Sequence, residues 1–197
     1  MKKLSLKIIQ IFIISLLVSC FSDKDEYFFS SKNIKLKWTA YKTTDKVPVS
    51  GLFEEVYISG AEKSHDLGQS IKNMTFRIPI SSINTHDKGR DLKIMKHFFS
   101  SMVGTSNIQG YVKEIAENNI VFSITLNDTE KDISASYTKR EDGVLVISAK
   151  MDLLKWNASS SIKSLNAECV DLHKGTDGIS KLWNEVDIEI EVDLKII

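Results

Sequence analysis

Along most of the chain, apolar and polar residues alternate with the two-residue period of a β-strand that is buried on one face. The clearest example is the stretch 186–196, in which Val, Ile and Leu occupy every second position and charged residues occupy the positions between them. The same alternation predicts eight strands, at residues 32–42, 49–58, 71–81, 107–116, 119–127, 131–139, 143–154 and 182–196. A strand with one apolar and one polar face is typical of an antiparallel sheet whose outer face contacts water.

Turn-forming residues separate the strands in the middle of the chain. Glu117-Asn118-Asn119, Asn127-Asp128-Thr129 and Glu141-Asp142-Gly143 each stand between two alternating runs. Asn, Asp and Gly are favoured in tight turns because they tolerate the backbone angles that such turns need. Residues 107–154 are therefore predicted to form a meander of four strands, and the polar stretch 59–70 is expected to be a loop.

Two segments, residues 88–99 and 160–174, place apolar side chains at helical spacing instead. For the second, Ser159 or Ser160 is expected to cap the start, and Gly175 is expected to end the helix. Eight strands with one apolar face each can avoid exposed edges by closing into a barrel. The sequence therefore predicts an all-β fold: an antiparallel eight-stranded β-barrel, with one or two short helices that cap or cover it.

The first twenty residues have the construction of a secretory signal, with three early lysines before a short apolar run. That run is too short for a good membrane-spanning helix. The sequence Leu17-Val18-Ser19-Cys20 resembles the lipobox of bacterial lipoproteins, which implies removal of residues 1–19 and attachment of lipid to Cys20. Residues 20–31 would then form a lipidated tether before a barrel domain at 32–197. An ordinary signal peptide with an incidental cysteine, or an uncleaved signal anchor, is the alternative.

Charge and cysteine content narrow the range of functions. The chain has 26 basic and 26 acidic side chains, so no positive excess is available to neutralise phosphates, and nucleic-acid binding is not expected. If Cys20 carries lipid, the other cysteine, Cys169, has no partner in the chain. An exported domain of this kind must then be stabilised by its core rather than by disulfides.

An ordered set of segments resembles the YceI-like family. The set comprises Trp38-Thr39-Ala40-Tyr41-Lys42, Gly51-Leu52-Phe53, Thr85 followed by Arg90-Asp91, Phe98-Phe99, and the stretch from Lys181 to Ile188. The segment 169–175 looks like the cysteine-and-histidine helix of a lipoprotein branch of that family. The resemblance implies an exported lipocalin-like barrel that binds, stores or transports a polyisoprenoid or other long amphipathic lipid in its lumen. It implies neither a cofactor nor an enzyme, and it leaves a homodimer open.

Aromatic residues are the candidates for the wall of such a lumen, because long apolar tails need an apolar tunnel. Each could equally be a plain core residue. The candidates are Trp38, Phe53, Phe76, Phe98, Phe99, Phe122 and Trp156.

Charged residues gather at 85–91, before the first predicted helix. One interpretation is a contact with a lipid head group, through Arg90 and His86. The other is structural, with Arg90 and Asp91 capping the helix and pairing with loop groups. The histidines and aspartates here match no standard metal-site spacing, so no metal is expected. The acidic residues of 186–196 are interpreted as a solvated face rather than as a cation site.

Cys169 and His173 are four residues apart, so on one helix they would share a face. A thiol beside an imidazole can act as nucleophile and base. Cys169, however, lies on the apolar stripe of the predicted helix, and a free cysteine is usually a small buried apolar residue. The sequence shows no third orienting group, and we expect no catalytic site.

Three classes of function follow from these observations. The preferred one is a membrane-tethered barrel that binds a long-chain lipid of the isoprenoid or fatty-acid type. The alternatives are an envelope interaction or scaffold protein with a filled barrel, and an enzyme or redox module that uses Cys169 and His173. Because Phe21 follows Cys20 in place of the aspartate that retains some lipoproteins at the inner membrane, the outer membrane is expected, with its side left open.

Overall fold

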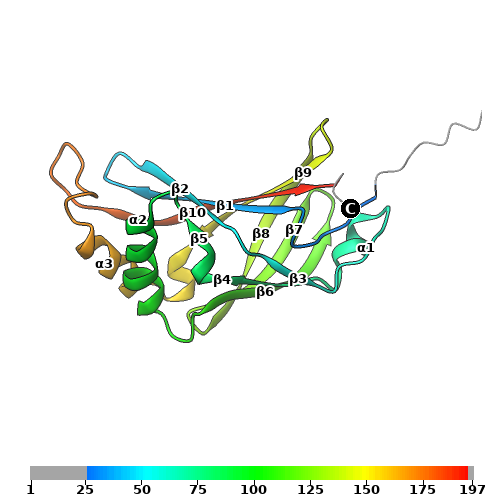
Figure 1. Cartoon of the computed structure of the whole chain (residues 1–197), viewed down its shortest axis with the longest axis horizontal. Coiled ribbons are helices and arrows are strands. Elements are labelled where there is room, and N and C mark those ends of the chain that lie inside the picture. Colours follow the sequence, from blue (N-terminus) through cyan, green and yellow to red (C-terminus); the bar gives the residue numbers. More distant parts are fainter. Residues whose placement is uncertain (1–25, 195–197) are drawn as a thin grey trace, which may run out of the picture.

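The computed structural model describes residues 26–194. The signal sequence and the lipid attachment predicted at Cys20 lie outside this range. Within it, ten strands form one antiparallel sheet in the order β3-β4-β6-β7-β8-β9-β10-β1-β2-β5. The strands are β1 (Ile34–Lys42), β2 (Val47–Phe53), β3 (Tyr57–Ser59), β4 (Thr75–Pro79), β5 (Ile83–Asn84), β6 (Asn107–Ala116), β7 (Asn119–Leu126), β8 (Thr129–Lys139), β9 (Val144–Asp152) and β10 (Leu182–Asp193). Figure 1 shows the sheet curling around its long axis into a half-barrel.

The prediction of an antiparallel all-β, lipocalin-like fold is confirmed, and so is the four-strand meander, which is β6 to β9. The described chain has ten strands rather than the predicted eight, for two reasons. The predicted strand 49–58 divides into β2 and β3, and β5 adds a further two residues. The division follows from Glu54 and Glu55, which are both exposed between the buried Phe53 and Val56. Two outward side chains in succession cannot belong to one regular strand, since side chains alternate between faces.

The break at 54–56 also joins the two edges of the sheet. β2 pairs with β5 at one edge, whereas β3 pairs with β4 at the other. The backbone N–H of Glu54 donates to the carbonyl of Ser82 at 3.0 Å, and that of Ile80 donates to Ser106 at 3.1 Å. The half-barrel is thus held together at its open side by the chain itself and by isolated hydrogen bonds.

The register of the strands keeps the inner face apolar. In the pairing of β1 with β10, Leu36 lies opposite Ile190 and Trp38 opposite Ile188. Ile120 and Leu145 in the meander and Val192 in β10 are inaccessible or nearly so, although the rest of β10 is only partly buried. Since a one-residue slip would turn every one of these side chains outward, the apolar face itself fixes the register.

The acidic positions of β10 lie on the outer face and are matched by cations on neighbouring segments. The pairs are Glu185 with Lys46 at 2.5 Å, Asp187 with Lys150 at 3.8 Å, Glu189 with Lys37 at 3.6 Å and Glu191 with Arg140 at 2.7 Å. Exposed pairs of this kind contribute little to stability, because water and salt screen them. The stripe is therefore a solvated charged face, as the sequence indicated.

The helices are short, and they gather mainly at one end of the half-barrel (Figure 1). The prediction of a helix at 88–99 is confirmed: α2 (Lys88–Lys93) continues through a wider π-type turn over Ile94–Phe98. α3 (Ser159–Glu168) packs beside it. α1 (Leu67–Ile71) lies at the opposite end, near the start of the described chain. Among the described residues, no helix is long and apolar enough to cross a membrane.

Three details of the helix predictions were wrong. α3 ends at Glu168 rather than at 174, because Cys169 already leaves helical geometry with ψ of 24°. Its start is not capped by Ser159 or Ser160, since Ala158 precedes the helix without a side-chain hydrogen bond, and Gly175 lies well beyond its end. The expected loop 59–70 includes most of α1, which begins where Asp66 accepts a hydrogen bond from the Gln69 N–H at 2.7 Å.

The folded domain also begins earlier than residue 32. Tyr27 pairs with Ser64 through two backbone hydrogen bonds, of 2.7 and 3.1 Å. Phe29 is 3% exposed and belongs to the core. The aromatic residues at the end of the predicted tether are thus part of the domain.

We predict that Gly110→Ala destabilises the protein by about 1–3 kcal/mol, the usual cost of overpacking a filled site. A Cβ at this position of β6 would collide with the carbonyl oxygen of Ser123 and with the ring of Phe76. Gly89→Ala in α2 is the control, because its Cβ would meet only the carboxylate of Asp87, at 3.3 Å. Urea unfolding should show a lower midpoint for the first variant alone; equal midpoints would contradict the packing at β6.

Acid should destabilise the fold, because surface carboxylates are held in their charged form. Lys113 lowers the pKa of Asp132, and Lys46 lowers that of Glu185, each chiefly by a side-chain hydrogen bond. A group whose pKa is depressed by folding contributes stability above its unfolded pKa and loses it as the pH falls through the folded value. Urea midpoints should therefore fall steeply below about pH 4, after a smaller fall below about pH 6.5, where the unfolded chain protonates His173, whose pKa burial lowers in the fold. Asp132→Asn should flatten the steep fall; an unchanged slope would argue against the contribution of that pair.

Candidate functional site

A cavity of about 520 Å³ occupies the end of the half-barrel that α2 and α3 cover. Its walls come from β1, β2, β10, both helices, and the turn that follows α3. Most of the lining is apolar, and it includes side chains such as Phe98, Phe99, Leu165 and Ile188. The cavity exists because the inward side chains of the curled sheet do not fill the space between the sheet and the helices.

A second cavity of about 110 Å³ lies deeper in the half-barrel, and no charged side chain lines it. Four side chains line both cavities: Phe53, Ile108, Met151 and Ile188. A single layer of apolar side chains therefore separates the two spaces. Together they form an apolar interior that runs from the helical end towards the meander.

Six of the seven aromatic residues predicted to form the wall line one or both cavities. Trp38, Phe53, Phe98 and Phe99 line the larger cavity, and Phe53, Phe76 and Phe122 line the smaller one. Edge-to-face contacts join several of them, with ring centroids 6.4 Å apart for Phe53 and Phe99 and 6.0 Å apart for Phe76 and Phe122.

Trp156, the seventh predicted wall residue, lines neither cavity. It is 1% exposed, and its indole N–H donates to the carbonyl of Ile124 at 2.9 Å. The structure thus places Trp156 in the core, beside β7, which is the alternative that the sequence left open for every aromatic residue.

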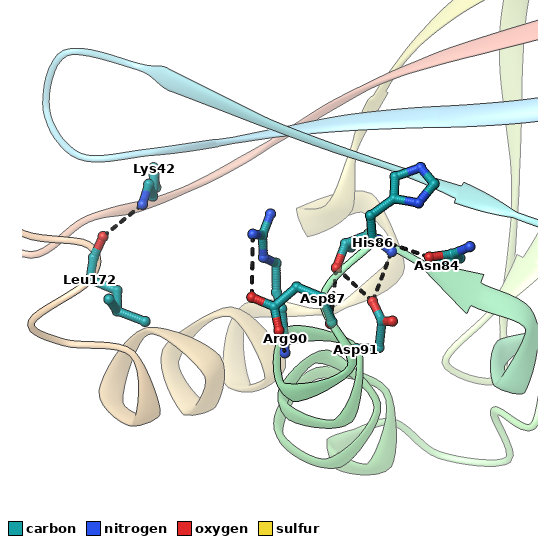
Figure 2. A network of polar contacts seen from close by, with 8 residues as sticks. Lys42, Asn84, His86, Asp87, Arg90, Asp91 and Leu172 are labelled. Atoms are coloured by element: carbon teal, nitrogen blue, oxygen red, sulfur yellow. Dashed lines mark hydrogen bonds and ion pairs between the residues drawn. The ribbon is translucent and has the colours of Figure 1, made fainter.

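The polar lining of the larger cavity is concentrated where α2 begins and where the chain turns after α3. Figure 2 shows this region, with Lys42, Asp87 and Arg90 around the gap between β1 and α2. The ammonium of Lys42 donates to the carbonyl of Leu172 at 3.0 Å, and Arg90 lies 3.6 Å from the carboxylate of Asp87. Since Leu172 and Arg90 are exposed, this polar region is the mouth of the cavity.

The loop before α2 is held by two aspartates with different roles. Asp87 is the N-cap and accepts a hydrogen bond from the backbone N–H of Arg90 at 3.0 Å, which lowers the pKa of Asp87. Asp91 accepts from both the backbone N–H and the hydroxyl of Thr85, at 2.9 and 2.6 Å. The expected pairing of Arg90 and Asp91 with loop groups is therefore confirmed, whereas their expected role as caps was wrong, because the capping oxygen belongs to Asp87.

The two predicted head-group residues are not brought to the same place. Arg90 lines the cavity, whereas His86 lines neither cavity. Figure 2 shows them on opposite sides of Asp87. The backbone of His86 adopts a left-handed conformation with φ of 60°, and its N–H donates to Asn84 at 2.8 Å. His86 thus shapes the loop, and only Arg90 is available at the mouth.

The chain after α3 brings a buried polar cluster to the cavity wall. Nδ1 of His173 lies 2.9 Å from Oδ1 of Asn166, and the hydroxyl of Ser180 donates to the same oxygen at 3.2 Å. His173 is 8% exposed and lines the larger cavity. Sequence reasoning identified His173 but missed Asn166 and Ser180, because polar residues seven positions away on either side match no known motif.

Cys169 and His173 do not share a helix, but they close one turn, in which the N–H of His173 donates to the carbonyl of Cys169 at 3.0 Å. Burial raises the pKa of the Cys169 thiol and lowers that of the His173 imidazole. Both groups are therefore neutral near pH 7, whereas a nucleophilic cysteine needs a thiolate. No group of three or more His, Cys, Asp or Glu side chains within residues 26–194 is arranged to hold a metal ion.

Comparison with known proteins places this geometry in a known fold. No protein-family model and no curated protein sequence matches the chain. Among solved structures, a polyisoprenoid-binding domain from Saccharophagus degradans superposes with a TM-score of 0.58 at 11% identity, covering 85% of this chain and 96% of that one. BcnA from Burkholderia cenocepacia superposes with a TM-score of 0.54, also at 11% identity, covering 83% and 97%.

A YceI protein from Campylobacter jejuni aligns at 16% identity over 97% of this chain and 91% of that one, with a TM-score of only 0.39. At such identities the first two superpositions establish shared architecture rather than shared activity. The chain therefore has a YceI-like fold, as the ordered sequence segments predicted.

Proposed function

We propose that this protein binds one long-chain amphipathic lipid, of the isoprenoid or fatty-acid type, inside the half-barrel, and stores or transports it in the cell envelope. The observation that carries the proposal is the apolar interior, a cavity of about 520 Å³ that continues behind one layer of side chains into another of about 110 Å³. Ligand sites in proteins occupy ~300–1,000 Å³ and combine apolar walls with a few polar groups.

The distribution of polar groups supports an amphipathic ligand rather than a wholly apolar one. Charged side chains line only the larger cavity, at its mouth, where Lys42, Arg90 and Lys93 meet Asp87. The deeper cavity is apolar throughout. A lipid with its head group at the mouth and its tail directed towards the meander matches this polarity, and this orientation is part of the proposal.

A solved structure with the same architecture also supports lipid binding. One protein with the same architecture is described as a polyisoprenoid-binding domain. An unfilled apolar space also argues against a filled barrel that acts only as a scaffold, since a protein interior without a ligand is normally close-packed.

We further propose that the domain is tethered to the outer membrane through lipid on Cys20. The support is the lipobox-like sequence, and durable anchoring by two or more acyl chains is the physical consequence. From Cys20 to Tyr27, where the fold begins, seven residues can span at most ~25 Å. The domain would then stay close to the membrane surface.

Native mass spectrometry of residues 21–197, followed by solvent extraction, tests the central proposal. We expect an additional mass of several hundred daltons that is lost on extraction and regained with a long-chain isoprenoid or fatty acid. A bare polypeptide mass that persists after incubation with both lipid classes would contradict lipid binding and favour the scaffold alternative.

The direction of the tail can be tested by filling the deeper cavity. Ala149 lines only that cavity, so Ala149→Phe should weaken binding of a twenty-carbon isoprenoid by about tenfold, while a ten-carbon isoprenoid binds as before. Ser148→Phe is the matched control, because the neighbouring side chain on β9 is exposed on the other face. Equal losses for both chain lengths, or a similar loss in the control, would contradict a tail in the deeper cavity.

A further inference from the structure

The buried cluster around His173 has one feature that the fold itself does not use. His173 places its Nδ1 edge against Asn166, and the hydroxyl of Ser180 donates to the same amide oxygen. The other ring nitrogen, Nε2, has no hydrogen-bond partner among residues 26–194, although the ring lines the larger cavity and is 8% exposed. Nε2 is not among the unpaired polar atoms of the described residues that are completely buried, so a molecule in the cavity can reach it.

The partner at Nδ1 decides which nitrogen carries the proton. In the orientation that the Asn166 side chain adopts, the atom 2.9 Å from Nδ1 is the carbonyl oxygen Oδ1, and a carbonyl oxygen can only accept. The Nδ1 of His173 must therefore donate to it. Burial and, to a smaller extent, the charge of Lys42 lower the pKa of His173, so the ring is neutral near pH 7. The Nε2 atom is then a bare hydrogen-bond acceptor.

The backbone fixes this acceptor in place. The N–H of His173 donates to Cys169 at 3.0 Å, and its carbonyl accepts from Lys181 at 3.2 Å. The ring is thus anchored to the end of α3 on one side and to the start of β10 on the other. A group that is held in place before binding loses little conformational entropy when a ligand arrives.

An unpaired acceptor in this largely apolar wall favours a ligand that can donate to it. A hydroxyl fits, because its hydrogen can go to Nε2 while its oxygen accepts from a cation such as Lys42, which lines the same cavity. An ether or a quinone carbonyl has no hydrogen to donate. A phosphate would need charge neutralisation, but Arg90 and Lys93 already have carboxylate partners in Asp87 and Glu168, each at 3.6 Å.

On the basis of the lipid binding proposed above, we propose that Nε2 of His173 accepts a hydrogen bond from a hydroxyl on the head of the lipid. The ligand class is therefore a long-chain alcohol or a comparable hydroxylated isoprenoid. Asn166 and Ser180 act as positioning residues, since they hold the proton on the opposite nitrogen.

The test compares ligands that share one tail. The full chain, kept soluble in amphipol so that no detergent competes, is titrated with geranylgeraniol, its methyl ether and geranylgeranyl phosphate. Binding is followed by tryptophan fluorescence, because Trp38 and Trp183 line the cavity. The alcohol should bind about tenfold more tightly than the ether, the value of one buried hydrogen bond whose loss leaves an acceptor unpaired.

Variants then assign the preference to His173. His173→Phe should bring the ratio of alcohol to ether affinity to about one while affinity for the ether stays within about threefold. His173→Gln retains an acceptor and should keep most of the preference. Asn166→Leu should reduce the ratio without changing affinity for the ether, which distinguishes positioning from a loss of stability. Thermal unfolding confirms that each variant is folded.

Several results would overturn the inference. Equal binding of alcohol and ether by the unmodified chain would do so, and so would a preference that survives in His173→Phe. Tightest binding of the phosphate, lost in Lys42→Met, would show that the mouth selects an anion instead. If neither the alcohol nor the ether binds, isoprenoid binding is contradicted, and the role of His173 with it, while binding of a fatty acid is decided by the mass-spectrometry experiment above.

Discussion

The pairing of β1 with β10 is the interaction on which the rest of the structure depends. It joins strands from opposite ends of the described chain and places Trp38 opposite Ile188. Both side chains line the larger cavity, so the same ladder that completes the sheet also builds the cavity wall. Because the partners are separated by about 150 residues, the pairing carries a large loop-closure cost and is expected to form late in folding.

Holding an apolar interior open is a second constraint, and the chain meets it by packing its wall closely. Trp38 lies against Gly51 of β2 so tightly that a Cβ there would come within 2.5 Å of the indole ring. The absence of a side chain at Gly51 lets the ring pack directly against the backbone of β2. Elsewhere, as around Trp156 and Ile120, the core is fully buried. Stability thus comes from the meander and its surroundings, while the helical end keeps space for a ligand.

Polar groups enter this interior only at the mouth, and the local structure explains why. Asp87 must cap α2, and Asp91 must hold the loop at Thr85, so both carboxylates are engaged in the fold. The turn that follows α3 carries the cavity's one buried imidazole among the described residues, that of His173. The mouth therefore combines a few fixed polar atoms with a long apolar space, which is the polarity of an amphipathic ligand.

The sequence by itself determined the strands, the meander and the fold class, because a two-residue period encodes which face is buried wherever one face contacts water. It also indicated the aromatic side chains that reach the interior, with Trp156 as the exception. Glu54 and Glu55 mark the division of the predicted strand 49–58, but the sequence could not determine that its two parts pair at opposite edges of the sheet. Nor could it determine the early end of α3, because apolar spacing continues to Leu172 although the backbone does not.

Only the tertiary structure decided what the polar residues do. At the start of α2, Arg90 reaches the cavity, whereas His86 in the preceding loop does not, since its own left-handed backbone redirects the chain there. Asn166, His173 and Ser180 form a cluster only because the turn after α3 folds back towards β10. Sequence periodicity records burial, which is local to each strand. Whether polar side chains such as those of Asn166 and Ser180 meet at one cavity depends on long-range packing, and the local pattern of apolar and polar residues cannot predict it.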